Sequence, residues 1–188
     1  MEKEKMSTRQ VAFMAVFAAI ILLATYVVKI PTPVYGYIHA GDGFVLLAGI
    51  LLGPLPGALA AGIGSALSVL IGGYPAWVPG TFAVKFLAAL VAAALYQRIR
   101  KNTDHKARKG MAVSVAVSGV IAELVMTGGY FFYNVLLISL LNTEFSGAGF
   151  ASAGVLAAAE VPFNLVQGAL GVAVAVVLAP LFLRRLRR

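Results

Sequence analysis

The sequence predicts an all-α integral membrane protein that crosses the bilayer six times and keeps both termini in the cytoplasm. Of its 188 residues, 61% are hydrophobic and only 12% are charged, whereas soluble domains are about 45–50% apolar and about 25% charged. The basic residues gather in three clusters, at 3–9, 98–109 and 184–188. Because cytoplasmic segments of membrane proteins concentrate Lys and Arg, we expect all three clusters inside.

Six apolar stretches form a single membrane domain over residues 1–188. The expected spans are 8–30, 42–54, 57–72, 80–98, 111–137 and 155–183. Two prolines and two glycines within 53–57 predict a tight turn between the second and third spans. A polar, glycine-rich segment at 142–154 is expected to link the last two spans. The resulting outer loops, at about 31–41, 72–79 and 138–154, contain no basic residue, as this topology requires.

The composition also excludes several functions. A chain this apolar is not expected to be a soluble enzyme or a nucleic-acid-binding domain. The absence of cysteine excludes disulfides, thiolate metal sites and a cysteine nucleophile. The phosphate-binding loop, His-Glu-x-x-His and Gly-x-Ser-x-Gly motifs are absent as well. We therefore expect no enzymatic activity, no cofactor and no metal; His39 has no second histidine nearby to form a metal site.

Polar residues recur at helical spacing in the last two spans, where their burial is costly and marks candidate functional positions. The fifth span carries Glu123, Thr127, Tyr130 and Asn134. The sixth span carries Glu160, Asn164 and Gln167. Each set falls on one helix face. The predicted topology brings the two faces to matching depth, which suggests one shared cavity in the outer half of the bilayer.

The outer loops add aromatic and ionisable side chains on the same side. They carry Tyr37, His39, Asp42, Tyr74 and Trp77, and Lys85 follows just inside the fourth span. Aromatic rings with a few placed polar groups are typical of small-molecule sites. The sequence therefore predicts a binding cavity that opens to the outside and is lined by these residues and by the two polar helix faces.

Each of these residues also has a purely structural interpretation. Tyr74 and Trp77 suit anchoring at the membrane interface. The two glutamates suit polar packing between helices. Asp42 precedes an apolar run between two glycines, which suits a helix N-terminus. The long side chain of Lys85 can extend outward to water. The binding interpretation rests on the group, because nearly all the buried polarity lies in one half of the membrane.

Sequence motifs between residues 37 and 85 resemble those of a known family. They are Tyr37-Ile38-His39-Ala40-Gly41-Asp42-Gly43, Leu52-Gly53-Pro54-Leu55-Pro56-Gly57 and Gly73-Tyr74-Pro75. In these motifs the chain is similar to the substrate-binding S components of energy-coupling factor (ECF) transporters, and most similar to the riboflavin-type branch. That branch is also associated with pyridoxine-type and hydroxymethylpyrimidine ligands, so the resemblance leaves the vitamin open.

The resemblance implies a vitamin-binding subunit of an ATP-driven uptake transporter in the plasma membrane of a prokaryote. Such a subunit binds its ligand from outside with its outer loops and the outer halves of its last three spans. It docks onto a transmembrane coupling subunit through an alanine motif in the first span, matched here by Ala15 and Ala19. Two ATPase subunits supply the energy, and the S component is expected to topple in the bilayer to release its ligand inside.

The charges of the expected cavity favour a small N-heterocyclic vitamin or precursor. Asp42 and the two glutamates suit cationic or N–H-rich groups, and the aromatic side chains suit stacking on a flat ring. We therefore expect a vitamin B6 form or the hydroxymethylpyrimidine precursor of thiamine, with riboflavin as the next choice. The alternative function is a stand-alone proton-coupled carrier in which Glu123 and Glu160 relay protons.

Overall fold

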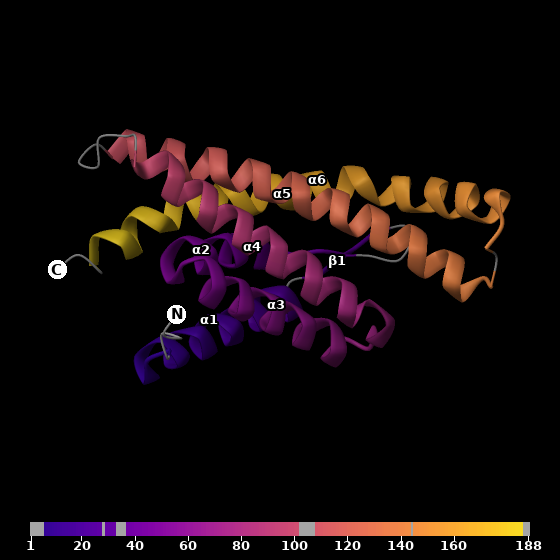
Figure 1. The fold of residues 1–188 in the computed structure, drawn as a ribbon, viewed down its shortest axis with the longest axis horizontal. Helices are drawn as coiled ribbons and strands as arrows, with labels where there is room; N and C mark the ends of the chain where they lie inside the picture. The colour runs from indigo at the N-terminus through magenta and orange to yellow at the C-terminus, as the bar shows by residue number, and fades with distance from the viewer. Residues whose placement is uncertain (1–5, 28, 33–36, 102–107, 144, 186–188) are drawn as a thin grey trace, which may run out of the picture.

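The computed structural model describes residues 6–27, 29–32, 37–101, 108–143 and 145–185, and nearly all of them are helical. The helices are α1 (Thr8–Val27), α2 (Gly41–Leu52), α3 (Pro54–Ile71), α4 (Val78–Lys101), α5 (Arg108–Leu141) and α6 (Gly147–Arg185). A 3₁₀ turn, η1 (Pro75–Trp77), precedes α4. Two short antiparallel strands, β1 (Ile30–Pro31) and β2 (Tyr37–Ile38), lie between α1 and α2. The helices form an elongated bundle (Figure 1).

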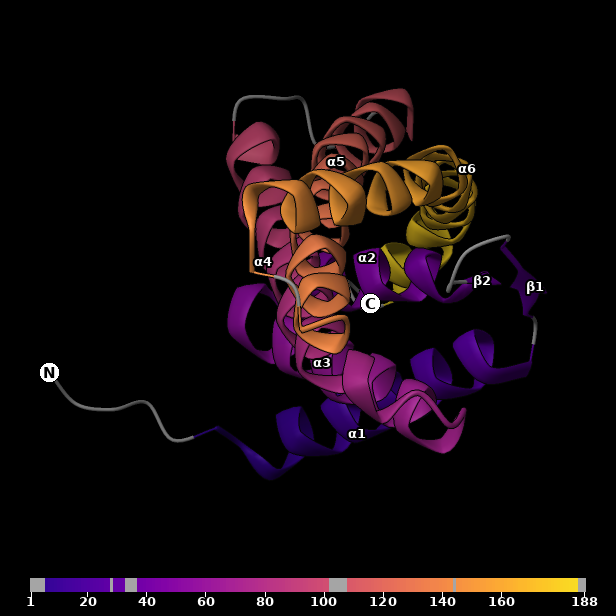
Figure 2. The ribbon, with the colours of Figure 1, turned by 90° about the vertical axis from the view of Figure 1, so that its right-hand side faces the viewer.

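Five helical segments in the described residues are long and apolar enough to cross a membrane, and α2 is not. At 1.5 Å per residue, the 12 residues of α2 extend about 18 Å, whereas the hydrocarbon core is about 30 Å thick. The predicted second span is therefore a half-length helix. It lies in the middle of the bundle (Figure 2), packed against α1, α3, α4 and α6.

Two of the predicted links are shorter than the sequence suggested. Gly53 alone separates α2 from α3, at a φ of 91° that favours glycine, and Pro54 begins α3 because proline suits the first turn of a helix. The expected link at 142–154 is also mostly helical. The hydroxyl of Ser146 caps α6 by accepting the amide N–H of Gly149 at 3.0 Å, which stabilises a helix start inside this glycine-rich segment.

Small residues bring the helices of the core close together. A Cβ atom added to Gly64 of α3 would lie only 3.0 Å from Cα of Ala18 in α1, and one added to Gly49 of α2 would lie 3.1 Å from the carbonyl carbon of Ala89 in α4. Such contacts leave no room for a side chain and let helix backbones approach each other. Gly64 and Gly49 therefore serve the packing of helices within the chain.

The basic clusters gather at one end of the molecule. The start of α1, the end of α4, the start of α5 and the end of α6 all lie at the left of Figure 1, and the remaining members of the three clusters fall outside the described residues. The hairpin formed by α5 and α6 marks the opposite end. This arrangement is the one that the charge pattern predicted, and the cytoplasmic location of the basic end stays a prediction.

Candidate functional site

The Gly-Asp-Gly sequence buries Asp42 at the start of α2. A Cβ on Gly41 would lie 2.9 Å from Nδ1 of His39, and a Cβ on Gly171 of α6 would lie 2.8 Å from Cβ of Asp42. Glycine at both positions therefore lets the neighbouring chain segments close over the carboxylate. Ala40 occupies the N-cap position without a side-chain cap, so the structure does not use Asp42 as the cap residue.

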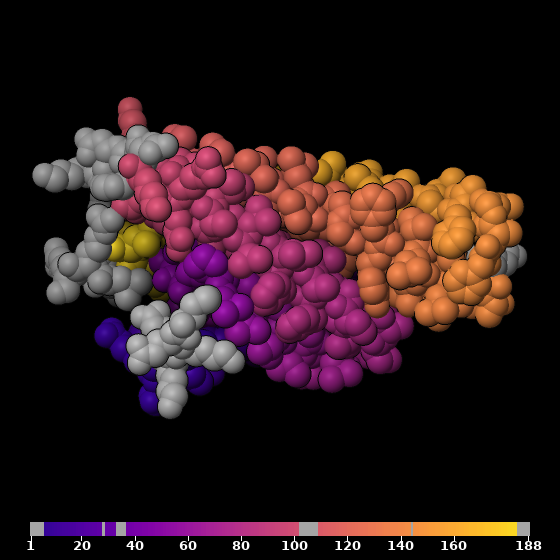
Figure 3. All heavy atoms as spheres, viewed as in Figure 1, coloured from indigo at the N-terminus to yellow at the C-terminus, as the bar shows by residue number. Residues whose placement is uncertain are grey.

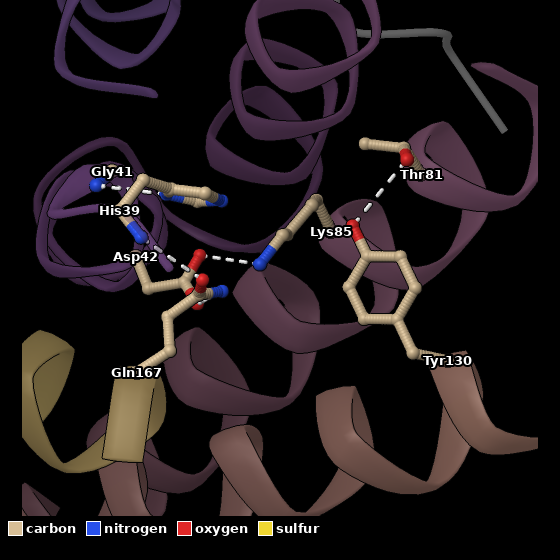
Figure 4. Close-up of polar contacts among 7 residues, drawn as sticks. All are labelled: His39, Gly41, Asp42, Thr81, Lys85, Tyr130 and Gln167. Carbon is tan, nitrogen blue, oxygen red and sulfur yellow. Dashed lines mark hydrogen bonds and ion pairs between the residues drawn. The ribbon is translucent and has the colours of Figure 1, made fainter. Parts of the chain in front are cut away.

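Asp42 forms a fully buried ion pair with Lys85 of α4, and α6 completes the network (Figure 4). Nε2 of Gln167 donates to the second carboxylate oxygen at 2.7 Å, and Oε1 of Gln167 accepts the amide N–H of His39 at 3.1 Å. Lys85 and Asp42 are at most 1% exposed, so Lys85 does not extend outward to water. Buried charges are tolerated when they are paired and hydrogen-bonded in this way.

His39 is a neutral side chain in this network. Its Nδ1 accepts the amide N–H of Gly41 at 3.1 Å, which requires that nitrogen to be unprotonated. Burial lowers the pKa of His39 to about 4, and the neighbouring Asp42 only partly offsets this effect. The neutral ring therefore carries its proton on Nε2, which is available as a hydrogen-bond donor.

A cavity of about 80 Å³ adjoins the ion pair and gathers most of the predicted site residues. These are Tyr37, His39, Tyr74, Trp77, Lys85, Tyr130, Asn134 and Gln167. The lining also includes Thr25, Ser65, Val69 and Thr81, which the sequence analysis missed. Thr25, Ser65 and Thr81 are small hydroxyl residues within apolar helices, and this pattern could have identified them.

Three buried hydroxyl groups in the lining lack a hydrogen-bond partner among the described residues, those of Thr25, Tyr37 and Ser65. Leaving a buried polar group unpaired costs about 1–3 kcal/mol, so these groups mark where a bound molecule can complete the hydrogen bonds. Burial, reinforced by the nearby Tyr130, raises the pKa of Tyr37 to about 12. Its hydroxyl therefore keeps its proton and can donate.

Aromatic side chains form one wall of the cavity. The ring centroids of Tyr37 and Tyr74 are 5.8 Å apart, and those of Tyr74 and Trp77 are 6.1 Å apart. Nε1 of Trp77 donates to Oδ1 of Asn134 at 3.2 Å, which joins η1 to α5. On the α5 side, Nζ of Lys85 lies 5.2 Å from the ring centroid of Tyr130. The wall thus combines flat rings with fixed polar groups.

Four of the predicted residues do not line this cavity. One of them, Asp42, is bound to the lining residues Lys85 and Gln167. Glu160 instead accepts a hydrogen bond from the hydroxyl of Thr32, at 2.8 and 2.9 Å from its two carboxylate oxygens. Glu123 lines a separate groove of about 310 Å³ between α5 and α6. Asn164 is half-buried and lies outside the lining. Helical spacing correctly placed several residues on one face, but it does not determine how deep along that face a cavity extends.

The predicted docking residues lie on the outside of α1. Ala15 and Ala19 are exposed, while Phe17 and Ile21 are buried against the rest of the bundle. At 100° per residue, the two alanines point away from this buried face. They therefore form a small-residue surface that is open to another membrane-embedded helix.

Comparison with known proteins identifies the family. A family model described as "ECF-type riboflavin transporter, S component" matches residues 5–185. The chain belongs to this family. Its members are transporter subunits rather than enzymes, and the helical membrane architecture described above is consistent with that membership. The vitamin bound by this S component does not follow from the family description.

Two solved structures share the fold of this S component. One, described as the S component of a bacterial ECF transporter, is 20% identical, with a TM-score of 0.62 over 96% of this chain and 98% of that chain. The other, the S component for biotin from an ECF-type ABC transporter, is 17% identical, with a TM-score of 0.53 over 94% and 95%. At these identities the similarity shows the fold alone.

One curated relative matches part of the sequence. It is described as an uncharacterized protein in the gap 3′ region of Pyrococcus woesei, and it is 42% identical over 66 residues. The match covers 35% of this chain and 44% of the relative. This relative therefore carries no information about the ligand.

Proposed function

We propose that this S component binds a small, uncharged, hydroxylated N-heterocycle in the cavity beside Lys85, for uptake by an ATP-driven ECF transporter in a prokaryotic plasma membrane. A vitamin B6 form or hydroxymethylpyrimidine is the preferred ligand. One observation carries the proposal: three unpaired, buried hydroxyl groups converge on a cavity with an aromatic wall, in a member of a vitamin-transporter family.

The charges of the site favour a ligand without net charge. Among the lining residues that the structure describes, Lys85 is the only Lys, Arg, Asp or Glu, and its ammonium is paired with Asp42. The carboxylate of Asp42 also accepts from Gln167, so it is not free to receive a cationic ligand. The sequence favoured a cationic group on the ligand. The charges of the folded site instead favour a ligand that binds through hydrogen bonds of its hydroxyl groups and ring nitrogens.

The size of the cavity favours a ligand with one ring. Pockets for drug-sized ligands enclose roughly 300–1,000 Å³, and this cavity encloses about 80 Å³. A single six-membered ring with short hydroxymethyl groups needs less rearrangement to enter than the three fused rings and sugar-alcohol chain of riboflavin. The neighbouring Tyr37, Tyr74 and Trp77 offer stacking surfaces for such a ring.

The ligand proposal is tested by titrating the purified protein with pyridoxine, hydroxymethylpyrimidine and riboflavin. Tyr37→Phe removes one unpaired hydroxyl and keeps the ring, so we expect the folded protein to be as stable and ligand affinity to fall about fivefold to tenfold, the equivalent of one hydrogen bond. Ser139→Ala is the matched control, because Ser139 has another buried, unpaired hydroxyl but lies outside the cavity lining. It should bind normally.

Two outcomes of this titration contradict the proposal in different ways. Binding of riboflavin alone would overturn the choice of ligand and keep the transporter function. Failure to bind any of the three, together with uptake that needs no ATPase and collapses with the proton gradient, would favour the proton-coupled carrier that uses Glu123 and Glu160.

We also propose that α1 docks this S component onto a transmembrane coupling subunit served by two ATPases. The exposed Ala15 and Ala19 support this proposal, because small residues let a partner helix approach closely. Ala15→Leu and Ala19→Leu should abolish uptake and leave ligand binding unchanged. Ala83→Leu, on the exposed surface of α4, is the control that should retain uptake. Loss of binding in the α1 variants would contradict a pure docking role.

A further inference from the structure

Helices α5 and α6 are much longer than a bilayer requires. They contain 34 and 39 residues, or about 51 and 58 Å at 1.5 Å per residue, against a hydrocarbon core of about 30 Å. The helices α1, α3 and α4 contain 20, 18 and 24 residues. The outer ends of α5 and α6 consequently extend beyond the other helices as a two-helix hairpin (Figures 1 and 3).

We define the hairpin tip as residues 135–143 and 145–158. Helices α5 and α6 contact each other, and within the tip Leu137 and Ile138 of α5 and Ala153 and Ala157 of α6 are buried. Its outward surface is apolar. The exposed residues include Leu136, Leu140, Leu141, Phe145, Phe150 and Val155. Within the described part of the chain, no other element of the protein covers these side chains.

The hairpin has the composition of a membrane-spanning segment along its whole length, including the tip. From 110 to 183 the sequence contains no Lys or Arg, and its acidic residues there are Glu123, Glu144 and Glu160. A helical hairpin standing in water would carry charged residues on its outer faces. The apolar surface is also continuous with the lower part of the same hairpin, where Val120, Leu124 and Leu165 are exposed.

We propose that the outward faces of the hairpin tip lie in the outer leaflet of the bilayer, with α5 and α6 tilted from the membrane normal. An apolar helix longer than the bilayer is thick is accommodated by tilting. A tilt of about 30° shortens α5 from about 51 Å to about 44 Å, which fits the roughly 40–45 Å of a bilayer with its headgroups. The same tilt leaves α6 at about 50 Å, so the first part of α6 must also lean away from the rest of that helix.

The shape of α6 agrees with this placement. Pro162 lies inside α6, where proline removes a backbone hydrogen bond and permits a kink. In Figure 2 the first part of α6, in orange, runs obliquely across the bundle, while the later part continues along it. The tip therefore leans sideways instead of extending straight out from the end of the bundle. Its proposed location does not depend on which ligand the cavity binds.

The absence of cysteine makes this placement directly measurable with single-cysteine variants of the full chain in lipid nanodiscs, where a membrane-impermeant reagent reaches both faces of the bilayer. Val155→Cys reports on the tip, where the native side chain is 73% exposed. Val16→Cys in α1 is the lipid-facing control, and Ser7→Cys, before the first helix, is the control in water. Each cysteine is reacted with a membrane-impermeant maleimide or labelled with an environment-sensitive fluorophore. Unchanged thermal unfolding of each variant confirms that it is folded.

For Val155→Cys we expect at least tenfold slower reaction with the impermeant maleimide than for Ser7→Cys. We also expect strong quenching of the fluorophore by lipids that carry a nitroxide near the top of the acyl chain. Reaction as fast as that of Ser7→Cys, without lipid quenching, would overturn the proposal. Protection without lipid quenching, together with cross-linking between two Val155→Cys chains, would also overturn it and identify a second copy as the occupant.

Discussion

The Asp42–Lys85 pair joins α2 to α4 inside the bundle, and each charge depends on the other. Removing one partner from a buried pair leaves an uncompensated charge, at a cost of about 3–5 kcal/mol. We therefore predict that Asp42→Asn and Lys85→Met will each destabilise the protein by that amount. The double variant should recover most of the loss, because no charge remains buried. Unfolding in mild detergent measures all three free energies.

Lys29→Met is the matched control for the lysine substitution. Nζ of Lys29 lies 4.7 Å from the ring centroid of Tyr37, outside the buried pair, and its loss should cost no more than about 1 kcal/mol. If the double variant loses as much stability as the two single variants added together, Asp42 and Lys85 do not interact and the prediction fails.

His39 makes stability depend on pH below neutrality. Because burial lowers its pKa from 6.5 to about 4, the unfolded chain binds a proton between these values that the folded chain does not. The neutral ring therefore makes its full contribution to the free energy of unfolding above pH 6.5. This contribution is lost as the pH falls towards 4, by up to about 3 kcal/mol. Unfolding measured at intervals between pH 7.5 and 4.5 should show this decline.

A His39→Gln variant separates this effect from other titrations. Glutamine keeps a hydrogen-bonding side chain and has no proton to gain in this range, so the variant should lose less stability than the wild type between pH 6.5 and 4.5. An identical decline in both proteins would assign the pH dependence to another group.

At the scale of elements, the two faces of α1 differ in how large a side chain they can accommodate. A Cβ on Gly64 would clash with the backbone of Ala18, so Gly64→Ala must separate α1 from α3. Overpacking of this kind costs about 1–3 kcal/mol, and we expect unfolding measurements to show such a loss. Ala15→Leu changes the exposed face of the same helix and should leave the free energy of unfolding within about 0.5 kcal/mol of the wild type. Equal losses would contradict this division.

At the scale of the whole molecule, the basic end is predicted to face the cytoplasm. The three basic clusters lie together at that end (Figure 1), and cytoplasmic segments concentrate Lys and Arg. In intact cells, a membrane-impermeant thiol reagent should label Pro31→Cys, in the exposed strand β1, and should not label Ser7→Cys. Labelling of Ser7→Cys before the cells are opened would contradict this topology.

Sequence patterns predicted the helical membrane class and most of the lining of the cavity. Helical spacing brought Tyr130 and Asn134 to the same side, and both line the cavity with Gln167. The predicted bounds of 42–54 already made the second span short, but the count of six spans treated it as a full crossing, whereas the 12 residues of α2 extend only about 18 Å against a hydrocarbon core of about 30 Å. The patterns did not show that Glu123 and Glu160 lie away from the cavity, because spacing gives direction around a helix but not contact between helices.

Composition, local periodicity and short motifs were enough to predict the membrane class, the expected orientation and the family resemblance. Apolar runs require a bilayer, clustered basic residues set the expected orientation, and the motifs of residues 37–85 indicate the family. Which buried polar groups form hydrogen bonds with one another became visible only in the folded protein. Asp42 is paired with Lys85, while the hydroxyls of Thr25, Tyr37 and Ser65 stay unpaired. Such pairing joins residues far apart in the chain, and only the packing of helices against one another brings them within hydrogen-bonding distance.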